Sequence, residues 1–423
     1  MNTAYFEKKN YKPKLKELPS KDLGICVVIP SYKEENLNIA LSALSKCILP
    51  KCNVEVLVVV NHPQDSPEGI VEISQETLQL VENFNRNNRN EKIEYFAVKA
   101  FDFPKKHAGV GLARQIGMDE AAFRLLKINS PLGIIACFDA DSTCDTNYLT
   151  ELEKLWEKNP KTNACSIRYA HPLSGSNYNP TIYKGIAEYE LHLRYYNQAS
   201  RYIGFPFAYH TVGSSMACSA SAYVKFGGMN RHQAGEDFYF LQKIIPHGNF
   251  LELNSTCIIP SPRPSDRVPF GTGRAMSKHL DNNEPFTTYQ LESFLELKTF
   301  FSLIEPFYNT TTVNDINTLI SQLPQTIKTF LLQNNATNAI LSVKKNSASL
   351  KAYRKRFFLW FDAFALLKYM NFSNENTYKR QPVIQEAEKL LTKMNLEIPK
   401  ENDAFSLLKL YRSLDEKTYQ FTF

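Results

Sequence analysis

The chain has 423 residues, of which 43% are hydrophobic and 22% are charged, and its formal net charge is +6. This composition is ordinary for a globular protein and excludes a chain that is disordered throughout. The length exceeds that of most single domains, so two domains are expected. The mild positive charge is compatible with anionic substrates such as nucleotide diphosphates. It is too small to indicate a nucleic-acid-binding protein, and no nucleic-acid partner is expected.

Targeting signals and cysteine usage bear on the compartment. Residues 1–21 are polar and basic, without the apolar core of a signal peptide, and are interpreted as a leader. The sequence contains no run of about 18–20 apolar residues, so no transmembrane helix is predicted. The eight cysteines are scattered without a Cys-x-x-Cys pair, so they are interpreted as reduced thiols. These features predict a cytoplasmic protein.

Apolar runs alternate with helical patterns in the first part of the chain. Four runs have the length and composition of buried strands, and the segments between them carry apolar residues at helical spacing. The runs cover residues 25–29, 54–60, 93–98 and 134–138, and helices are expected after Ser31, from Ser66 and over 109–126. This alternation predicts βαβ units and therefore a mostly parallel sheet covered by helices. Such sheets bind ligands at the carboxyl ends of their strands.

Two of these helix starts are predicted from local chemistry. The hydroxyl of Ser31 and the carboxylate of Glu34 have the spacing of a capping box. Ser66-Pro67-Glu68 opens the next helix, with proline at its first position.

The pattern changes after the fourth strand. Short strands and aromatic helices are expected up to about residue 259, followed by a loop over 260–274. From about residue 285 the chain is predicted to be all-helical, with helices near 288–304, 347–371, 382–395 and 403–415. We therefore predict a leader (1–21), an α/β domain (22–283) and a helical C-terminal region (284–423).

The strongest chemical signal is an acidic pair directly after the fourth strand. Asp139 and Asp141 flank Ala140 on the turn that follows this strand. Two carboxylates so placed can face one divalent cation, and Mg²⁺ or Mn²⁺ prefers such oxygen ligands, with substrate phosphates completing the shell. The alternative is that both acids only end the strand and shape the turn. Their place in a βαβ series favours the metal site.

A second acidic motif, Gly235-Glu236-Asp237, precedes a helical pattern over 238–245. We interpret Asp237 as a general base, because an acceptor hydroxyl is a poor nucleophile until a carboxylate takes its proton. Capping is the alternative, since the helix dipole favours carboxylates at a helix start.

Candidate phosphate-binding residues follow two glycine-containing segments. Gly109 and Gly111 precede a helix in which Arg114 could pair with a phosphate or a ribose, although a solvated arginine is an equal alternative. The loop over 261–274 is interpreted as a lid over a diphosphate, or else as an ordinary surface loop. Its arginines are Arg263, Arg267 and Arg274, and the weaker candidates are His210 and His279.

Together these motifs resemble the glycosyltransferase family 2 pattern on a GT-A fold. The likeness rests on Val28-Ile-Pro-Ser-Tyr-Lys-Glu34 at the end of the first strand, Asp139-Ala-Asp141 after the fourth, and Gly235-Glu-Asp237 on a late helix. It covers roughly residues 22–270, and the helical C-terminal region lies outside it.

The resemblance implies roles for these residues. Asp139 approaches the ribose or the metal, Asp141 ligates the metal, and Asp237 is the base of a single displacement that inverts the anomeric centre. The nucleotide-sugar site that we predict consists of Pro30, Ser31, Tyr32, Glu34, Asn61, Arg114, Asp139, Ala140, Asp141 and Glu236.

The chain also departs from the family pattern. Many members carry Asp-Asp-Gly-Ser after the second strand, and an acid of that motif contacts the base. Here the chain reads Asn61-His-Pro-Gln-Asp65, so the identity of the base stays open. The Gln-x-x-Arg-Trp signature of processive synthases and their membrane helices are both absent from the sequence, which indicates a nonprocessive enzyme.

The sequence therefore predicts a metal-dependent, inverting and nonprocessive transfer of a sugar from a UDP- or GDP-sugar to an acceptor hydroxyl. The acceptor is a glycan or a lipid-linked molecule, as in surface glycan assembly. The alternatives are a retaining sugar transferase, a nucleotidyltransferase and a catalytically silent nucleotide-sugar-binding scaffold. The basic, aromatic stretch 351–369 suggests peripheral contact with an anionic membrane, with an amphipathic packing helix as the alternative.

Overall fold

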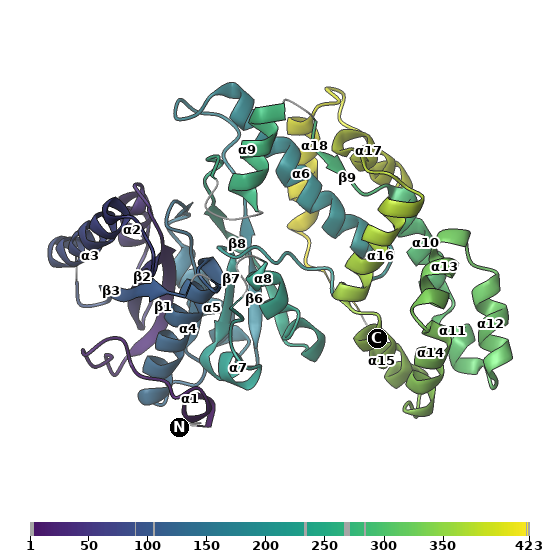
Figure 1. Cartoon of the computed structure of the whole chain (residues 1–423), viewed down its shortest axis with the longest axis horizontal. Coiled ribbons are helices and arrows are strands. Elements are labelled where there is room, and N and C mark those ends of the chain that lie inside the picture. The colour runs from purple at the N-terminus through teal and green to yellow at the C-terminus, as the bar shows by residue number, and fades with distance from the viewer. Residues whose placement is uncertain are drawn as a thin grey trace. The chain divides into compact units, whose positions relative to one another are not determined.

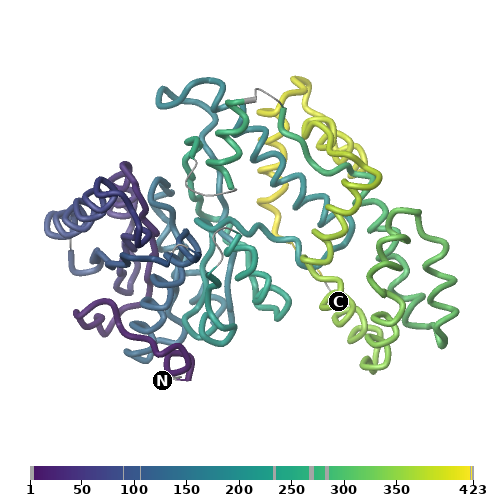
Figure 2. The backbone as a smooth tube through the Cα atoms, in the orientation of Figure 1, coloured from purple at the N-terminus to yellow at the C-terminus, as the bar shows by residue number. Residues whose placement is uncertain are grey.

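The computed structural model describes residues 4–88, 90–104, 106–231, 235–265, 271–282, 285–419 and 421. The chain forms two compact units, the first of residues 1–178 and 210–278, the second of residues 179–209 and 279–423. It passes from the first unit to the second and back before it enters the second unit again, a path that can be followed in Figure 2.

The first unit is built on an eight-stranded sheet with the order β3-β2-β1-β4-β7-β6-β8-β5 (Figure 1). The strands are β1 (Leu23–Ser31), β2 (Asn53–Pro63), β3 (Ile93–Phe103), β4 (Ile134–Cys137), β5 (Thr143–Cys144), β6 (Ala164–Tyr169), β7 (Met216–Ser219) and β8 (Phe250–Ile259). Parallel pairs join β1 to β2 and β4, β2 to β3, and β6 to β8, whereas β7 is antiparallel to both of its neighbours and β5 to β8. The four predicted strands and the mostly parallel sheet of an α/β architecture are confirmed.

Helices cover both faces of the sheet because its central strands are apolar on both sides. On β1, Ile25, Val27 and Ile29 share a buried cluster with residues of α2, α3 and α5. Val28 points the other way, toward Gly117 of α4. The helices of this part of the chain are α1 (Ala4–Lys8), α2 (Leu37–Ser45), α3 (Glu68–Asn88), α4 (Val110–Lys127), α5 (Tyr148–Lys158), α7 (Ala220–Lys225), α8 (Glu236–Leu241), the 3-10 helix η1 (Ile245–His247) and α9 (Thr272–Asn282).

The predicted capping box at Ser31 is wrong. Ser31 is the last residue of β1, which stays paired with β2 up to this point. The helix α2 begins only at Leu37, and no side chain caps it. The carboxylate of Glu34 instead accepts a hydrogen bond from the backbone N–H of Asn36 at 2.9 Å. Glu34 is thereby left on the loop at the end of β1.

The second unit is almost entirely helical, as predicted for the C-terminal region. Its elements are α6 (Pro180–Tyr202), α10 (Leu291–Ser302), α11 (Ile304–Asn309), α12 (Val313–Ser321), α13 (Gln325–Gln333), α14 (Ala336–Lys345), α15 (Leu350–Trp360), α16 (Ala363–Asn376), α17 (Val383–Lys393) and α18 (Ala404–Asp415), with a short antiparallel pair of β9 (Thr287–Thr288) and β10 (Gln381–Pro382). The single helix predicted over 347–371 is two helices, because the side chain of Asp362 caps a new helix start.

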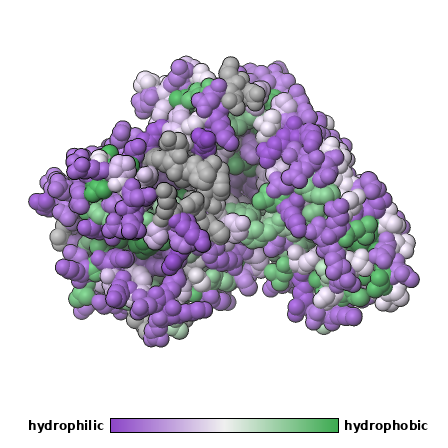
Figure 3. All heavy atoms as spheres, in the orientation of Figure 1, coloured by the Kyte–Doolittle hydropathy of each residue, from purple (hydrophilic) through white to green (hydrophobic). Residues whose placement is uncertain are grey.

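The described helices do not include one that is both long enough and apolar enough to cross a membrane. Hydrophilic residues make up most of the face seen in Figure 3. Within the basic, aromatic stretch 351–369, Tyr353, Phe357, Phe358 and Tyr369 are buried in the second unit. Their rings are used in packing, which favours the amphipathic packing helix over a membrane-bound one.

The close approach of α4 to the sheet can be tested at Gly117. A Cβ at this position would lie 2.7 Å from Cγ2 of Val59 and nearer still to Cγ1 of Val28. Overpacking of this kind costs about 1–3 kcal/mol, so Gly117→Ala should lower the midpoint of urea unfolding. Gly69→Ala in α3 is the matched control, since nothing lies within 4 Å of its added methyl group. The control should be neutral or slightly stabilising, and equal destabilisation of both variants would contradict the packing described.

Candidate active site

The carboxyl ends of β1 and β4 lie side by side because these two strands pair in parallel. In the order β3-β2-β1-β4, successive strands are added on one side of β1 and then on the other. Such a switch point is where open α/β sheets bind ligands. The backbone N–H of Phe138 donates to the carbonyl of Val28 at 3.0 Å, so the pairing continues up to Asp139. The first acidic motif therefore starts at this edge of the sheet.

Arg114 joins the two acidic motifs. It lies in the second turn of α4 and its side chain is 5% exposed. One guanidinium nitrogen donates to Oδ1 of Asp139 at 2.5 Å, and another donates to Oε1 of Glu236. Burial alone would lower the pKa of Arg114, but the two carboxylates outweigh burial and raise it. The guanidinium stays charged and brings both acids to one place.

Gly213 makes room for this guanidinium. A Cβ at Gly213 would lie 2.8 Å from Cζ of Arg114, and closer still to one of its nitrogens. Any side chain here would take the place of Arg114. The segment 210–215 therefore contacts Arg114 through its glycine.

The second acidic motif forms the first turn of α8. Gly235 precedes this helix with φ of 72°, a left-handed conformation that favours glycine, and the helix begins at Glu236. Oδ1 of Asp237 accepts a hydrogen bond from the N–H of Phe238 at 2.7 Å. Burial and the neighbouring Glu236 raise the pKa of Asp237 from 3.8 to about 7, while Arg114 acts in the opposite direction. A carboxylate with this pKa can accept a proton near neutral pH.

A second arginine connects β1 to the first acidic motif. Arg263 donates to Oε2 of Glu34 at 2.7 Å and to Oδ2 of Asp141 at 3.1 Å. It belongs to the loop predicted as a lid, but its pairing with Glu34 has no signal in the local sequence. Arg274 lies in α9, and Arg267 falls outside the described residues.

The cluster has more negative than positive groups. It contains the carboxylates of Glu34, Asp139, Asp141, Glu236 and Asp237 and the guanidinium groups of Arg114 and Arg263. No group of three or more potential metal ligands gathers in the part of the chain that the structure describes. Two carboxylates with substrate phosphates are nevertheless enough for Mg²⁺ or Mn²⁺. The oxygen donors of Asp139 and Asp141 fit such a cation, which would share them with the two arginines.

Other residues singled out in the sequence have different surroundings. Pro30, Tyr32 and Ala140 lie at the same sheet edge. The side-chain amide of Asn61 donates to the carbonyls of Ser31 at 3.0 Å and Val59 at 3.2 Å, so it ties the ends of β1 and β2 together. The ring of His210 packs edge-on against Tyr169, whereas His279 stacks on Phe286 within the second unit.

The contribution of Arg114 to ligand binding can be separated from the contribution that any buried ion pair makes to stability. Arg124, also on α4, pairs with Glu55 at 2.5 Å and is equally buried, but it lies away from both acidic motifs. Removing one partner of a buried pair costs about 3–5 kcal/mol, so Arg114→Met and Arg124→Met should both lower the unfolding midpoint. Only Arg114→Met should also weaken the binding of a nucleotide diphosphate, at least tenfold by calorimetry. Equal binding by the two variants would contradict a role of Arg114 in the site.

Comparisons with known proteins bear on this site. Residues 26–214 match the model of the family "Glycosyl transferase family 2", so the match includes Arg114 and the first acidic motif and ends before Gly235. No curated protein matches the chain.

Similar solved structures are the S. aureus TarS fragment 1–349, alone and in complex with UDP-GlcNAc. Each is 14% identical, with 79% of this chain and 91% of that chain covered and a TM-score of 0.40. The longer S. aureus TarS structure is 15% identical with a TM-score of 0.39, and the match covers 74% of this chain and 53% of that one. Residues 26–214 therefore form a glycosyl transferase family 2 domain, and the protein is a glycosyltransferase.

Proposed function

We propose that this enzyme transfers a sugar from a UDP- or GDP-sugar to an acceptor hydroxyl, with inversion at the anomeric carbon and with Mn²⁺ or Mg²⁺ as cofactor. The acceptor is a glycan or a lipid-linked molecule, and one sugar is added at each encounter. Surface glycan assembly is the process that we assign to this reaction.

One observation carries the proposal. The guanidinium of Arg114 contacts both Asp139 and Glu236, and Asp237 follows Glu236 directly. Arg114 therefore brings an acid suited to a cation close to the motif that carries an acid suited to a proton. A displacement needs both acids at separate places, since the leaving diphosphate and the incoming hydroxyl occupy opposite sides of the sugar.

The residues divide the work between these two sides. Asp139 and Asp141 would hold the cation, which when bound stabilises the charge that grows on the departing diphosphate. Pro30, Ser31 and Tyr32 lie at the end of β1, where they would line the pocket for the base and ribose. Asp237 would take the proton of the acceptor hydroxyl as the new bond forms.

The chemistry of Asp237 follows from its surroundings. Burial beside Glu236 raises its pKa to about 7, which makes it a stronger base than an exposed aspartate. Arg114 limits this rise, so that a substantial fraction of Asp237 is ionised at neutral pH. The pair formed by Glu236 and Arg114 thus tunes the base without contacting the acceptor.

Asp237→Asn should abolish transfer and leave donor binding unchanged, because an amide cannot accept the proton. In the unaltered enzyme, kcat/KM should fall about tenfold per pH unit below pH 7, where Asp237 becomes protonated. Product formation and donor calorimetry between pH 5 and 9 measure both effects, and the anomeric configuration of the product tests inversion. If Asp237→Asn instead weakens donor binding, and transfer falls only by the same factor, Asp237 belongs to donor recognition.

Asp141→Ala should remove metal-dependent binding of the donor. A thermal-shift screen of UDP- and GDP-sugars with and without Mn²⁺ measures this, since a ligand at 100 times its Kd stabilises the fold by about 2.7 kcal/mol. Asp145→Ala is the control, because Asp145 lies four residues further along the same segment and no described arginine bonds its carboxylate. The control should keep the Mn²⁺-dependent shift. Donor binding that is independent of Mn²⁺ in the unaltered enzyme would refute the metal requirement.

A further inference from the structure

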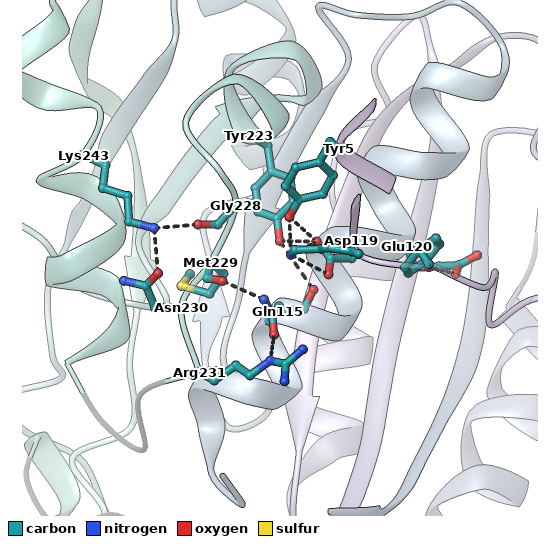
Figure 4. Close-up of polar contacts among 12 residues, drawn as sticks. Tyr5, Gln115, Asp119, Glu120, Tyr223, Gly228, Met229, Asn230, Arg231 and Lys243 are labelled. Carbon is teal, nitrogen blue, oxygen red and sulfur yellow. Dashed lines mark hydrogen bonds and ion pairs between the residues drawn. The ribbon is translucent and has the colours of Figure 1, made fainter. Parts of the chain in front are cut away.

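The short segment 228–231 precedes α8, the helix that carries Asp237, and it is attached to α4 by a side chain that the proposed mechanism does not use (Figure 4). We infer that this side chain, Gln115, is a positioning residue for Asp237, and that the N-terminal residues behind it complete the support. The inference rests on the proposed role of Asp237 as the base.

The side-chain amide of Gln115 forms two hydrogen bonds with this segment, one through its nitrogen and one through its oxygen. Its Nε2 donates to the carbonyl of Met229 at 2.9 Å, and its Oε1 accepts from Nε of Arg231 at 3.0 Å. Gln115 is 6% exposed, so neither bond exchanges readily with water. In Figure 4 the amide lies between Met229 and Arg231. The amide therefore fixes the backbone at Met229 and the side chain of Arg231, which precede the second acidic motif in the chain.

Arg114 and Gln115, neighbours on α4, hold two places in the chain, one at the start of α8 and one before it. Consecutive residues of a helix point about 100° apart, so the two side chains reach different partners. Arg114 contacts Glu236 at the start of α8, and Gln115 contacts Met229 and Arg231 before it. Arg114 is shared with Asp139, so the Gln115 attachment is the one that involves no group of the proposed donor site.

Lys243 also contacts this segment. It follows α8, and its Nζ donates to the carbonyl of Gly228 at 3.0 Å and to Oδ1 of Asn230 at 2.7 Å. The residues before α8 are thus tied to the residues after it. A movement at Met229 would be passed on to the helix that carries Asp237.

Tyr5, near the N-terminus, contacts both α4 and this segment. Tyr5 donates to Oδ1 of Asp119 at 2.7 Å, and Tyr223 donates to the same oxygen at 2.8 Å. The ring of Tyr5 lies against Gly228, where a Cβ would be 3.0 Å from Cζ and where φ is +70°. Asp119 and Gln115 are four residues apart and so lie on one face of α4. That face supports the segment at Gly228 and at Met229.

Precise placement matters more for the base than for donor binding. A displacement of about 1 Å at a reacting group can cost about 100-fold in rate. On the proposed assignment the donor is held by the ends of β1 and β4, whereas the side chain of Gln115 bonds to Met229 and Arg231. Loss of this attachment should therefore reduce kcat and leave donor affinity nearly unchanged.

Gln115→Met tests the inference, because methionine has a similar length but forms neither hydrogen bond. We expect kcat to fall 10- to 100-fold, the donor KM and calorimetric Kd to change less than twofold, and hydrogen exchange of the amides in α8 to speed up. Gln198→Met is the matched control. Gln198 is also buried in a helix and donates to Asp415 at 2.5 Å, but in the second unit. The control should lose similar stability and keep both kcat and the exchange rate of α8.

The outcomes separate the inference from the function on which it rests. Unchanged kcat and unchanged exchange in Gln115→Met would overturn the positioning role. A rise in donor Kd that matches the fall in kcat would also overturn it, because the segment would then bind the donor. If the unaltered enzyme transfers no sugar, the proposed function fails, and faster exchange of α8 in Gln115→Met would no longer support a role in catalysis.

Discussion

The site depends on one buried cation, the guanidinium of Arg114. Glu236 is almost inaccessible to solvent, and a buried carboxylate without a partner would cost several kcal/mol. Arg114 supplies that partner and at the same time binds Asp139. The ion pair with Glu236 offsets the cost of burying Glu236, and the same guanidinium fixes Asp139. The arrangement requires a glycine at position 213, because a side chain there would displace the guanidinium.

The cluster has more carboxylates than guanidinium groups. This excess of negative charge explains why the site suits a positively charged ligand. Two guanidinium groups face five carboxylates in the described cluster, and burial beside Glu236 keeps the pKa of Asp237 near 7. Like charges held together by the fold reduce its stability, and binding of a divalent cation relieves that repulsion. The same excess of acid that raises the pKa of Asp237 therefore favours the cofactor that we propose.

The sequence was sufficient for elements that depend on local pattern and insufficient for contacts between distant segments. The strands β1 to β4 were predicted because parallel strands buried on both faces are nearly continuous apolar runs. The helices α12 to α14, which occupy much of residues 313–345, were predicted only as part of an all-helical region and without bounds of their own. The capping box at Ser31 failed because β1 continues through Ser31 and α2 begins only at Leu37. Glu34 is instead bonded by Arg263, which lies more than two hundred residues further along the chain. Both acidic motifs were found, but Arg114 was assigned to a phosphate, since its pairing with Asp139 and Glu236 exists only in the folded chain.

The two acidic motifs differ in how the fold holds them, and this difference has a functional consequence. Asp139 directly follows β4, and the hydrogen bonds of the sheet continue up to Phe138 just before it. Asp237 lies on a helix of six residues that is fixed by side chains rather than by the sheet. A change in those side chains can move the base without disturbing the strand ends. On the proposed assignment, donor binding is thus tied to the rigid sheet, while the position of the base relative to the acceptor is set by separate, replaceable contacts.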